Sequence, residues 1–384
     1  MILISILFYS YIICIFLFVI GFYKVKEFKR TNTSEKTAFS VIIPFRNEAK
    51  NLPKLLDSIQ HLKYRKELIE FLFVDDDSSD SSVDIINCHF EPSREISQIH
   101  IDSTRPDIRV LKNKRVSNSP KKDAILTALK NAKNNWIITT DADCILPKNW
   151  LKTIDNFIQL NNCNMIVAPV SYEGNSSFLH QFQELDFMSL QATTVSGFGL
   201  NIPFLANGAN LMYRKDMFEK LNGFDGNNNI ASGDDVFLLE KFISFYKEKV
   251  QYLKSEDVIV KTFPVNTFSE LIEQRVRWAS KSSNYKVFTG KLIGFFVLAA
   301  NAILATAPVL VLLKIMKLET FIFYFLLKLL FDYILIERMA IFNKKKVAFN
   351  PFFKSSFVYP YFTLLIFLKS IFSNYQWKER TFKK

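Results

Sequence analysis

The sequence is poor in the residues that build common nucleotide and nucleophile motifs. Only 10 of its 384 residues are glycines. It contains neither of the glycine-rich phosphate loops GxxxxGK[ST] and GxGxxG. The serine nucleophile motif GxSxG is also absent. If this chain binds a nucleotide, it must therefore hold the phosphates with a metal ion and basic side chains.

Cysteine is scarce as well, and nucleic-acid motifs are missing. The four cysteines, Cys14, Cys88, Cys144 and Cys163, lack the spacing of metal ligands, and a cytoplasmic domain would keep them reduced. The formal net charge is +12, but no nucleic-acid recognition motif accompanies it, so no nucleic-acid partner is expected. The charge suits anionic membrane lipids or a phosphorylated substrate.

Apolar residues make up 49% of the chain and gather at its two ends. Residues 1–23 carry no charge and are long enough to cross about 30 Å of hydrocarbon as a transmembrane helix. A signal peptide would have a shorter apolar core and a basic start. Here a basic linker, residues 24–38, follows the apolar run. The positive-inside rule therefore places the N-terminus outside and the middle of the chain in the cytoplasm.

Residues 290–384 are predicted to form a second membrane region. Spans are expected at about 292–313 and 320–337. In the second span, Lys328 and Asp332 lie four residues apart on one helical face, and pairing would ease their cost in lipid.

The last apolar segment, at about 352–371, contains Pro360 and has a short uninterrupted apolar run. A further span there would place the basic C-terminal tail outside, so an interfacial or re-entrant helix is expected instead. The prediction is a multi-pass protein of a bacterial-type inner (cytoplasmic) membrane, with the middle of the chain as a domain in the cytoplasm.

The middle of the chain alternates strand-like and helix-like segments. The expected strands are 39–45, 70–76, 107–113, 136–143 and 165–170. One helix is expected to begin between Asn47 and Asn51, and an amphipathic helix to cover 121–133. This alternation predicts an α/β fold with a doubly wound, mostly parallel sheet. Ligands bind such sheets beyond the carboxyl ends of the strands, which is where carboxylates follow the second and fourth strands.

Asp75, Asp76 and Asp77 follow the second strand. Aspartate is a common turn residue, and the serines after it continue the turn chemistry. Three adjacent carboxylates repel one another, however, and a turn needs only one of them. One of the three could accept hydrogen bonds from a nucleobase N–H or from ribose hydroxyls.

Asp141 and Asp143 follow the fourth strand. Oxygen ligands at this spacing suit Mg²⁺ or Mn²⁺, with substrate phosphates completing the coordination. The alternative is a turn or helix cap ahead of Pro147. Lys121 and Lys122 begin the helix before this strand, either as a solvated helix end or as cations near a nucleotide.

Asp234 and Asp235 precede an apolar helical segment. One aspartate is enough to suit a helix N-terminus, so the second could act as a general base.

Farther along, Thr267 and Glu270 form a capping box that predicts a helix start. Gln274, Arg277 and Trp278 then share one helical face and could form a diphosphate clamp and a sugar platform. The alternative is a basic helix on the membrane surface.

Seven segments occur in the order of a known pattern: FSVIIPFRNE, FLFVDDDSSD, the Lys-Lys helix, TTDADC, NGANLMYRKDMF with GFD, SGDD and QRVRW. In this order they resemble membrane-bound family 2 glycosyltransferases, such as cellulose synthases and poly-N-acetylglucosamine synthases. The resemblance covers roughly residues 39–280. It implies a GT-A glycosyltransferase domain over 39–285, between N- and C-terminal transmembrane helices.

The resemblance implies roles for particular residues. Nucleotide-sugar binding is implied for Pro44, Glu48, Asp75, Asp76, Lys122, Asp141, Gln274, Arg277 and Trp278. Asp141 and Asp143 would hold Mg²⁺ or Mn²⁺, and Asp235, or Asp234 beside it, would be the catalytic base. Two features depart from the family pattern: Gly-Asp-Asp stands in the TED-like motif, and Pro120 replaces a glycine before the lysines.

The implied activity is that of an inverting, metal-dependent, hexosyltransferase-type enzyme. It would move a sugar from a nucleotide-sugar donor, expected to be a UDP-sugar, to a glycan or lipid-linked acceptor in cell-envelope polysaccharide or glycolipid synthesis. A processive polysaccharide synthase, with an export partner, is the alternative: QRVRW favours it, and the small number of spans disfavours it. An inactive membrane-anchored nucleotide-binding or scaffold protein would be expected to lack a motif acid, and none is missing.

Overall fold

The computed structural model describes residues 2–90, 106–228, 230, 232–281, 284–378 and 380–382. Its internal contacts divide the chain into two compact units. One unit, here called the helical unit, comprises Met1–Lys26, Tyr172–Leu205 and Pro264–Lys384. The other, here called the sheet unit, comprises Glu27–Ser171 and Ala206–Phe263.

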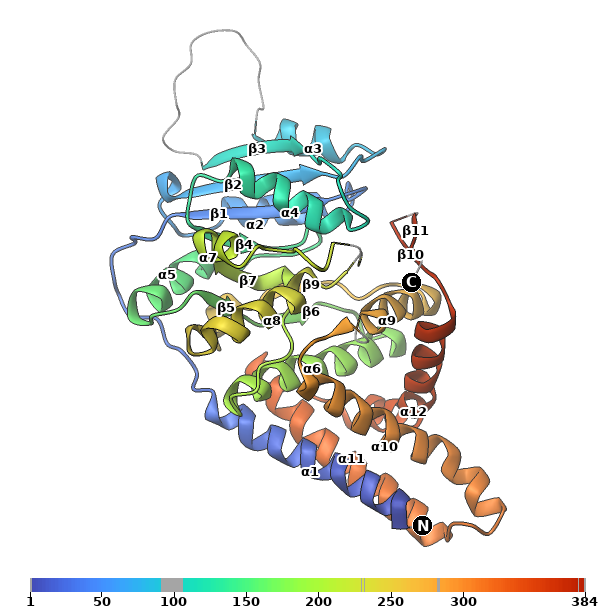
Figure 1. Cartoon of the computed structure of the whole chain (residues 1–384). Coiled ribbons are helices and arrows are strands. Elements are labelled where there is room, and N and C mark those ends of the chain that lie inside the picture. Colours follow the sequence, from blue (N-terminus) through green and yellow to red (C-terminus); the bar gives the residue numbers. More distant parts are fainter. Residues whose placement is uncertain are drawn as a thin grey trace, which may run out of the picture. The chain divides into compact units, whose positions relative to one another are not determined.

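Seven strands of the described chain form the main sheet, in the order β3-β2-β1-β4-β7-β5-β8 (Figure 1). The bounds are β1 Phe39–Phe45, β2 Ile69–Asp75, β3 Asp107–Lys112, β4 Trp136–Thr139, β5 Met165–Val167, β7 Leu211–Arg214 and β8 Val250–Tyr252. The first four strands pair in parallel, whereas β7 runs antiparallel to both of its neighbours. The prediction of a doubly wound, mostly parallel sheet is confirmed. A further pair joins β6 (Val170–Tyr172) and β9 (Val260–Thr262).

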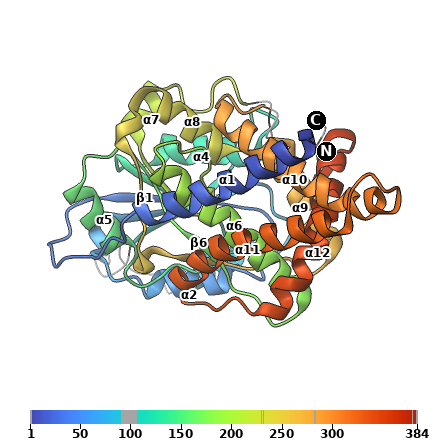
Figure 2. The same cartoon turned by 90° about the horizontal axis from the view of Figure 1, so that it is seen from below.

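Helices cover both faces of this sheet. The helices of the sheet unit are α2 Leu52–Gln60, α3 Ser82–Phe90, α4 Pro120–Asn131, α5 Trp150–Leu160, α7 Lys215–Lys220 and α8 Asp234–Tyr246. Helices α4, α7 and α8 lie on one face, and α2 lies on the other (Figures 1 and 2). Short 3-10 turns occur at Lys66–Leu68, Gly208–Asn210, Lys247–Lys249 and Glu256–Val258.

The order of the strands locates the binding edge of the sheet. The chain proceeds outward from β1 to β2 and β3, then returns to the opposite side of β1 as β4. In open α/β sheets ligands bind at such a reversal, beyond the carboxyl ends of the strands. Asp141 comes two residues after β4, and Asp75 is the last residue of β2. Both therefore lie at this edge.

Two predicted strands differ from those observed. The segment expected at 136–143 ends as β4 at Thr139, because the chain turns: the Cys144 N–H donates to the carbonyl of Asp141 at 3.2 Å. The segment expected at 165–170 is divided into β5 and the start of β6. Pro169 stands at the break and has no N–H to donate to a ladder.

The helix starts agree with proline chemistry. Pro53 lies in the first turn of α2, as expected. Pro120 likewise lies in the first turn of α4, where its missing N–H costs nothing. The replacement of glycine by Pro120 therefore does not prevent the helix from starting at that residue.

The helical unit is built from long helices. Their bounds are α1 Ile2–Lys24, α6 Phe178–Gly199, α9 Phe268–Ser280, α10 Phe288–Leu312, α11 Leu318–Phe342 and α12 Phe349–Phe372, followed by the hairpin β10 Tyr375–Trp377 and β11 Arg380–Phe382. Helix α1 packs against α6, α10 and α11 (Figures 1 and 2). Glycines permit the close crossing with α6: a Cβ on Gly199 would lie 1.8 Å from the carbonyl oxygen of Gly21.

Three helices of the described chain, α1, α10 and α12, are long and apolar enough to span a membrane. Helix α11 covers the predicted span at 320–337 but carries five charged residues and is not among the three, so that span remains a prediction. Its expected ion pair is confirmed, with Lys328 Nζ 2.5 Å from Asp332 Oδ2. Helix α12 continues through Pro360, and its interfacial placement also remains a prediction.

Candidate active site

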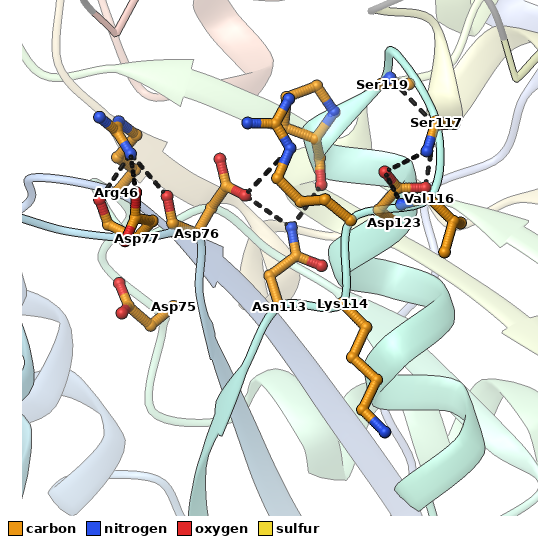
Figure 3. Close-up of polar contacts among 12 residues, drawn as sticks. Arg46, Asp75, Asp76, Asp77, Asn113, Lys114, Val116, Ser117, Ser119 and Asp123 are labelled. Carbon is orange, nitrogen blue, oxygen red and sulfur yellow. Dashed lines mark hydrogen bonds and ion pairs between the residues drawn. The ribbon is translucent and has the colours of Figure 1, made fainter.

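The three carboxylates at the end of β2 have different partners (Figure 3). Asp75 Oδ1 accepts the Ser78 N–H at 3.0 Å, as in a simple turn. Asp77 has a positive φ of 66°. Its side chain is 79% exposed and lies beside Arg46. The turn interpretation therefore explains Asp75 and Asp77 but not Asp76.

Asp76 is buried and held from the neighbouring strand. It is 6% exposed, and its Oδ1 accepts from Asn113 Nδ2 at 2.7 Å (Figure 3). Arg115 Nε lies 3.9 Å from the same oxygen. Asn113 is itself fixed, because its N–H donates to the Asp75 carbonyl at 2.9 Å. A carboxylate oriented in this way suits recognition of a nucleobase N–H or ribose hydroxyls.

Pro44 and Glu48 lie at the carboxyl end of β1. Pro44 is in the strand itself, opposite Val74 of β2. Glu48 supports the start of α2: its carboxylate accepts from Asn51 Nδ2 at 2.6 Å, and its N–H donates to Ser82 Oγ at 2.8 Å. Both residues are thus near the binding edge, and their nucleotide contacts remain a prediction.

Asp141 and Asp143 lie in the turn after β4, with partly exposed side chains. The Thr140 N–H donates to the Ile42 carbonyl at 3.1 Å, so hydrogen bonds to β1 fix the backbone as far as the residue before Asp141. Lys121 Nζ, from the first turn of α4, lies 2.7 Å from Asp141 Oδ1.

Asp234 and Asp235 begin α8 next to the same lysine. Asp234 Oδ2 lies 3.3 Å from Lys121 Nζ. Asp235 accepts from the Val236 N–H at 2.7 Å and from the Gly208 N–H at 3.3 Å. The capping residue of the helix is Gly233, with φ 86° and no side-chain cap, so neither aspartate acts as the N-cap. Lys121 therefore links the turn of Asp141 and Asp143 to the aspartates that begin α8. These four aspartates and Lys121 are here called the acidic cluster.

The electrostatics of this cluster keep Lys121 charged. Burial alone would lower the pKa of the ammonium, but the carboxylates of Asp141 and Asp234 raise it well above its usual range. The backbone also approaches closely. A Cβ on Gly208 would lie 2.9 Å from Asp234 Oδ2 and 3.1 Å from Lys121 Nζ, so a larger residue there would displace the ends of these two side chains.

Lys122, for which the resemblance implies nucleotide binding, has different partners from Lys121. It is 1% exposed, and its Nζ donates to the carbonyls of Asn227 at 2.7 Å and Ile230 at 2.9 Å. The ammonium also lies 5.1 Å from the centre of the Phe237 ring. These contacts hold the segment before α8, and a nucleotide contact by Lys122 remains a prediction.

The donor chemistry of Asp141 and Asp143 fits Mg²⁺ or Mn²⁺. Carboxylate oxygens are the ligands that these ions prefer. Among the described residues no group of three His, Cys, Asp or Glu side chains could hold a metal. Substrate phosphates or water would therefore complete the coordination.

Helix α9, in the helical unit, carries the predicted sugar-platform residues. The capping box is confirmed, with Thr267 Oγ1 accepting the Glu270 N–H at 3.2 Å and Glu270 Oε2 accepting the Thr267 N–H at 3.0 Å. Gln274, Arg277 and Trp278 follow on the helix, all partly buried.

Arg275 is a residue of this helix that sequence reasoning missed. It is 6% exposed, and its Nε donates to Asp186 Oδ2 at 2.6 Å. Burial lowers the pKa of the guanidinium, but Asp186 reverses this and raises it. Arg275 also donates to Gln274 Oε1 and lies 4.3 Å from the centre of the Trp278 ring. It therefore fixes two of the three predicted residues.

Comparisons with known proteins identify the family of this chain and agree with its fold. The family model described as "Glycosyl transferase family 2" matches residues 40–221. The model described as "Glycosyl transferase family group 2" matches residues 136–367, which is more than half of the chain.

Two curated relatives are similar in sequence. A "Probable glycosyltransferase" of Sulfolobus acidocaldarius is 22% identical over 272 residues, covering 65% of this chain and 55% of that protein. "Glycosyltransferase AglE" of Haloferax volcanii is 24% identical over 247 residues, covering 64% of this chain and 73% of that protein. The chain thus spans about half the length of the first relative.

A solved structure has a similar fold. The mannosyltransferase PcManGT from Pyrobaculum calidifontis, in complex with GDP-Man and Mn²⁺, matches with a TM-score of 0.57 and 14% identity over 97% of both chains. At this identity the likeness concerns the GT-A-like α/β fold alone. Together with the two family models, the sheet and its acidic edge lead to one conclusion: this chain belongs to the family 2 glycosyltransferases.

Proposed function

We propose that this enzyme transfers a sugar from a nucleotide-sugar donor to a membrane-proximal glycan or lipid-linked acceptor, with inversion and with a divalent metal. The observation that carries the proposal is the cluster at the sheet edge. There, Lys121 lies within 2.7 Å of Asp141 and 3.3 Å of Asp234. Candidate metal ligands, a cation and a candidate base are thus close to one another.

Donor binding is assigned to the carboxyl ends of β2 and β4. Asp76 would accept hydrogen bonds from the base or the ribose, since Asn113 and Arg115 hold its carboxylate in place. Asp141 and Asp143 would hold Mg²⁺ or Mn²⁺, which when bound neutralises charge on the leaving diphosphate. The PcManGT complex with GDP-Man and Mn²⁺ supports this metal choice at the level of the fold.

Asp235 is the proposed general base. Asp234 is 8% exposed and paired with Lys121, whereas Asp235 is more exposed. Asp235 would take the proton of the acceptor hydroxyl while the acceptor oxygen forms a bond to the anomeric carbon. The bond to the diphosphate breaks on the opposite face, which inverts the anomeric configuration.

The residues of α9 complete the proposal. Arg277 and Gln274 would contact the diphosphate, and Trp278 would present its ring to the acceptor sugar. The support is chemical: the motif stands on a capped helix, and Arg275 fixes Gln274 and Trp278.

The test is hydrolysis of a panel of sugar nucleotides by the full-length, detergent-purified protein with Mn²⁺ or Mg²⁺. The panel should contain UDP-sugars and GDP-mannose, and Asp143→Ala is the control. We expect metal-dependent hydrolysis of one donor class, lost in the control. Hydrolysis that is equal in wild type and control, or absent for every donor, would contradict the proposal.

The processive polysaccharide synthase remains the alternative within the same family. Its distinguishing property is product length. A ladder of long products on a gel would favour it, and a single added sugar would favour the proposal above.

A further inference from the structure

Lys121 has the position of a counter-ion within the acidic cluster. Its ammonium lies 2.7 Å from Asp141 Oδ1 and 3.3 Å from Asp234 Oδ2, on a side chain that is 19% exposed. It therefore bridges a predicted metal ligand to the acid next to the proposed base.

Lys121 is paired with two carboxylates at once. Asp141 and Asp143 share one turn, Asp234 and Asp235 share another, and Lys121 lies between Asp141 and Asp234. Carboxylates this close repel one another strongly unless a cation lies between them. The lysine thus stabilises the site when no ligand is bound.

The same ammonium disfavours the binding of a metal ion at Asp141. Asp141 Oδ1 already accepts a charge-assisted hydrogen bond, which occupies a lone pair that a metal would use. A fixed positive charge a few ångströms away also repels a divalent cation. Without nucleotide, Mn²⁺ must either displace the Lys121 ammonium from Asp141 or bind beside its positive charge.

We propose that Lys121 is a resident cation that keeps the Asp141–Asp143 turn from loading with metal until a nucleoside diphosphate arrives. This inference rests on the proposed function. The diphosphate brings negative charge and new acceptor oxygens, so the ammonium can turn from Asp141 to a phosphate. The metal then gains the carboxylate, and the two ligands bind with positive coupling.

The two neighbouring lysines differ in their capacity for this movement. The Lys121 side chain is partly exposed, and an ammonium has three donors on a flexible stem, so it can change partners. Lys122 donates to two backbone carbonyls and is 1% exposed. Lys121 is therefore the one suited to exchange, and Lys122 the one suited to hold the adjacent segment.

The experiment measures Mn²⁺ binding by the full-length protein in detergent, by calorimetry and by the electron paramagnetic resonance signal of free Mn²⁺. Titrations are made with Mn²⁺ alone and with saturating UDP or GDP. We expect Lys121→Met to bind Mn²⁺ alone about tenfold more tightly than wild type, and to lose most of the coupling to nucleotide. A merely structural lysine would lower the affinity when removed, not raise it.

Two controls accompany this variant. Lys121→Arg keeps the charge and should behave as wild type. Lys133→Met removes a 66% exposed lysine that pairs with Asp107, and it should leave Mn²⁺ affinity unchanged. Unchanged or weaker Mn²⁺ binding by Lys121→Met, at an unchanged melting temperature, would overturn the proposal.

Wild type provides a test that needs no variant. UDP or GDP should raise its Mn²⁺ affinity by about tenfold or more, and equal affinity with and without nucleotide would also overturn the proposal. If wild type binds neither nucleotide, the proposed function fails instead. The Mn²⁺-alone comparison of wild type and Lys121→Met still decides the role of Lys121.

Discussion

At the scale of single residues, the two aspartates that begin α8 differ in their surroundings. Asp234 pairs with Lys121, and Asp235 accepts backbone N–H groups and is more exposed. We expect Asp235→Asn to lower turnover by about 100-fold or more, since a general base contributes that much. Binding of UDP or GDP with Mn²⁺, measured by calorimetry, should stay near the wild-type value.

The matched control is Asp234→Asn, which removes a partner of Lys121. It should change nucleotide and metal binding as well as turnover. Full turnover in Asp235→Asn would show that another group takes the proton.

Asp143 supports a second prediction at this scale. Asp143→Ala removes one of the two oxygen ligands proposed for the metal, so nucleoside diphosphate should bind about tenfold more weakly in the presence of Mn²⁺. Asp77→Ala is the control, because that side chain is 79% exposed. Calorimetry that finds the same Mn²⁺-dependent affinity in Asp143→Ala and wild type would exclude Asp143 as a ligand.

Sequence patterns predict which residue types gather at the sheet edge but not always which residue reaches it. Asp76 and Asp141 follow predicted strands, so their common edge can be inferred. Lys121 and Lys122 are adjacent, and which of them faces the carboxylates depends on how α4 is rotated against the sheet. Asn113 is the last residue of a predicted strand, and only the pairing of β2 with β3 shows that it meets Asp76.

At the scale of elements, a buried ion pair joins α9 to α6. Arg275 and Asp186 are 6% and 7% exposed by side chain, and Tyr359 of α12 donates to Asp186 at 3.1 Å. Asp186→Asn or Arg275→Met alone leaves a buried charge without its partner, so each should lower the free energy of unfolding by about 3–5 kcal/mol. The double variant should cost less than the sum, because it leaves no unpaired charge.

The measurement is unfolding of the detergent-solubilised protein, made for the wild type, the two single variants and the double variant. Arg214→Ala is the control, since its ion pair with Asp216 is 36% and 42% exposed and should contribute about 0–1 kcal/mol. Strict additivity of the Asp186 and Arg275 changes would argue that the two side chains do not interact.

Short sequence patterns predict where a helix or strand begins better than they predict which other elements it contacts. The capping box at Thr267 and Glu270 predicts the start of α9, because both groups lie within one turn. Asp186 and Arg275 are 89 residues apart, so no local pattern relates them. The division of the predicted strand at 165–170 also depends on distant residues. Its first part, β5, pairs within the main sheet, whereas β6 pairs with β9, where the Val260 N–H donates to the Pro169 carbonyl.

At the scale of the whole molecule, charge and hydropathy support a membrane enzyme. Three described helices could span a membrane, and basic residues follow α1 at the linker 24–38 and α11 at Lys344, Lys345 and Lys346. By the positive-inside rule, both basic segments belong in the cytoplasm, which requires the predicted span at 320–337 to cross the membrane as well. We therefore propose an inner-membrane protein whose catalytic domain is cytoplasmic, in contact with anionic lipid.

The native cysteines make this orientation testable. Cys88, in α3, is exposed. Burial raises the pKa of Cys144 well above its usual range and that of Cys163 to about 12. Their side chains are also buried, at 1% and 5% exposure, so neither should react with a maleimide. Cys14 lies within the candidate span α1, where a membrane-impermeant reagent should not reach it.

A membrane-impermeant maleimide should therefore label Cys88 in inverted membrane vesicles but not in intact cells. Lys317→Cys, in the exposed connection between α10 and α11, should show the opposite pattern, because α10 would carry the chain outward in the proposed orientation. The signal from Cys88→Ser gives the background. Labelling of Cys88 from outside would place the catalytic domain on the other side of the membrane. It would then be separated from the cytoplasmic pool of sugar nucleotides on which the proposed function depends.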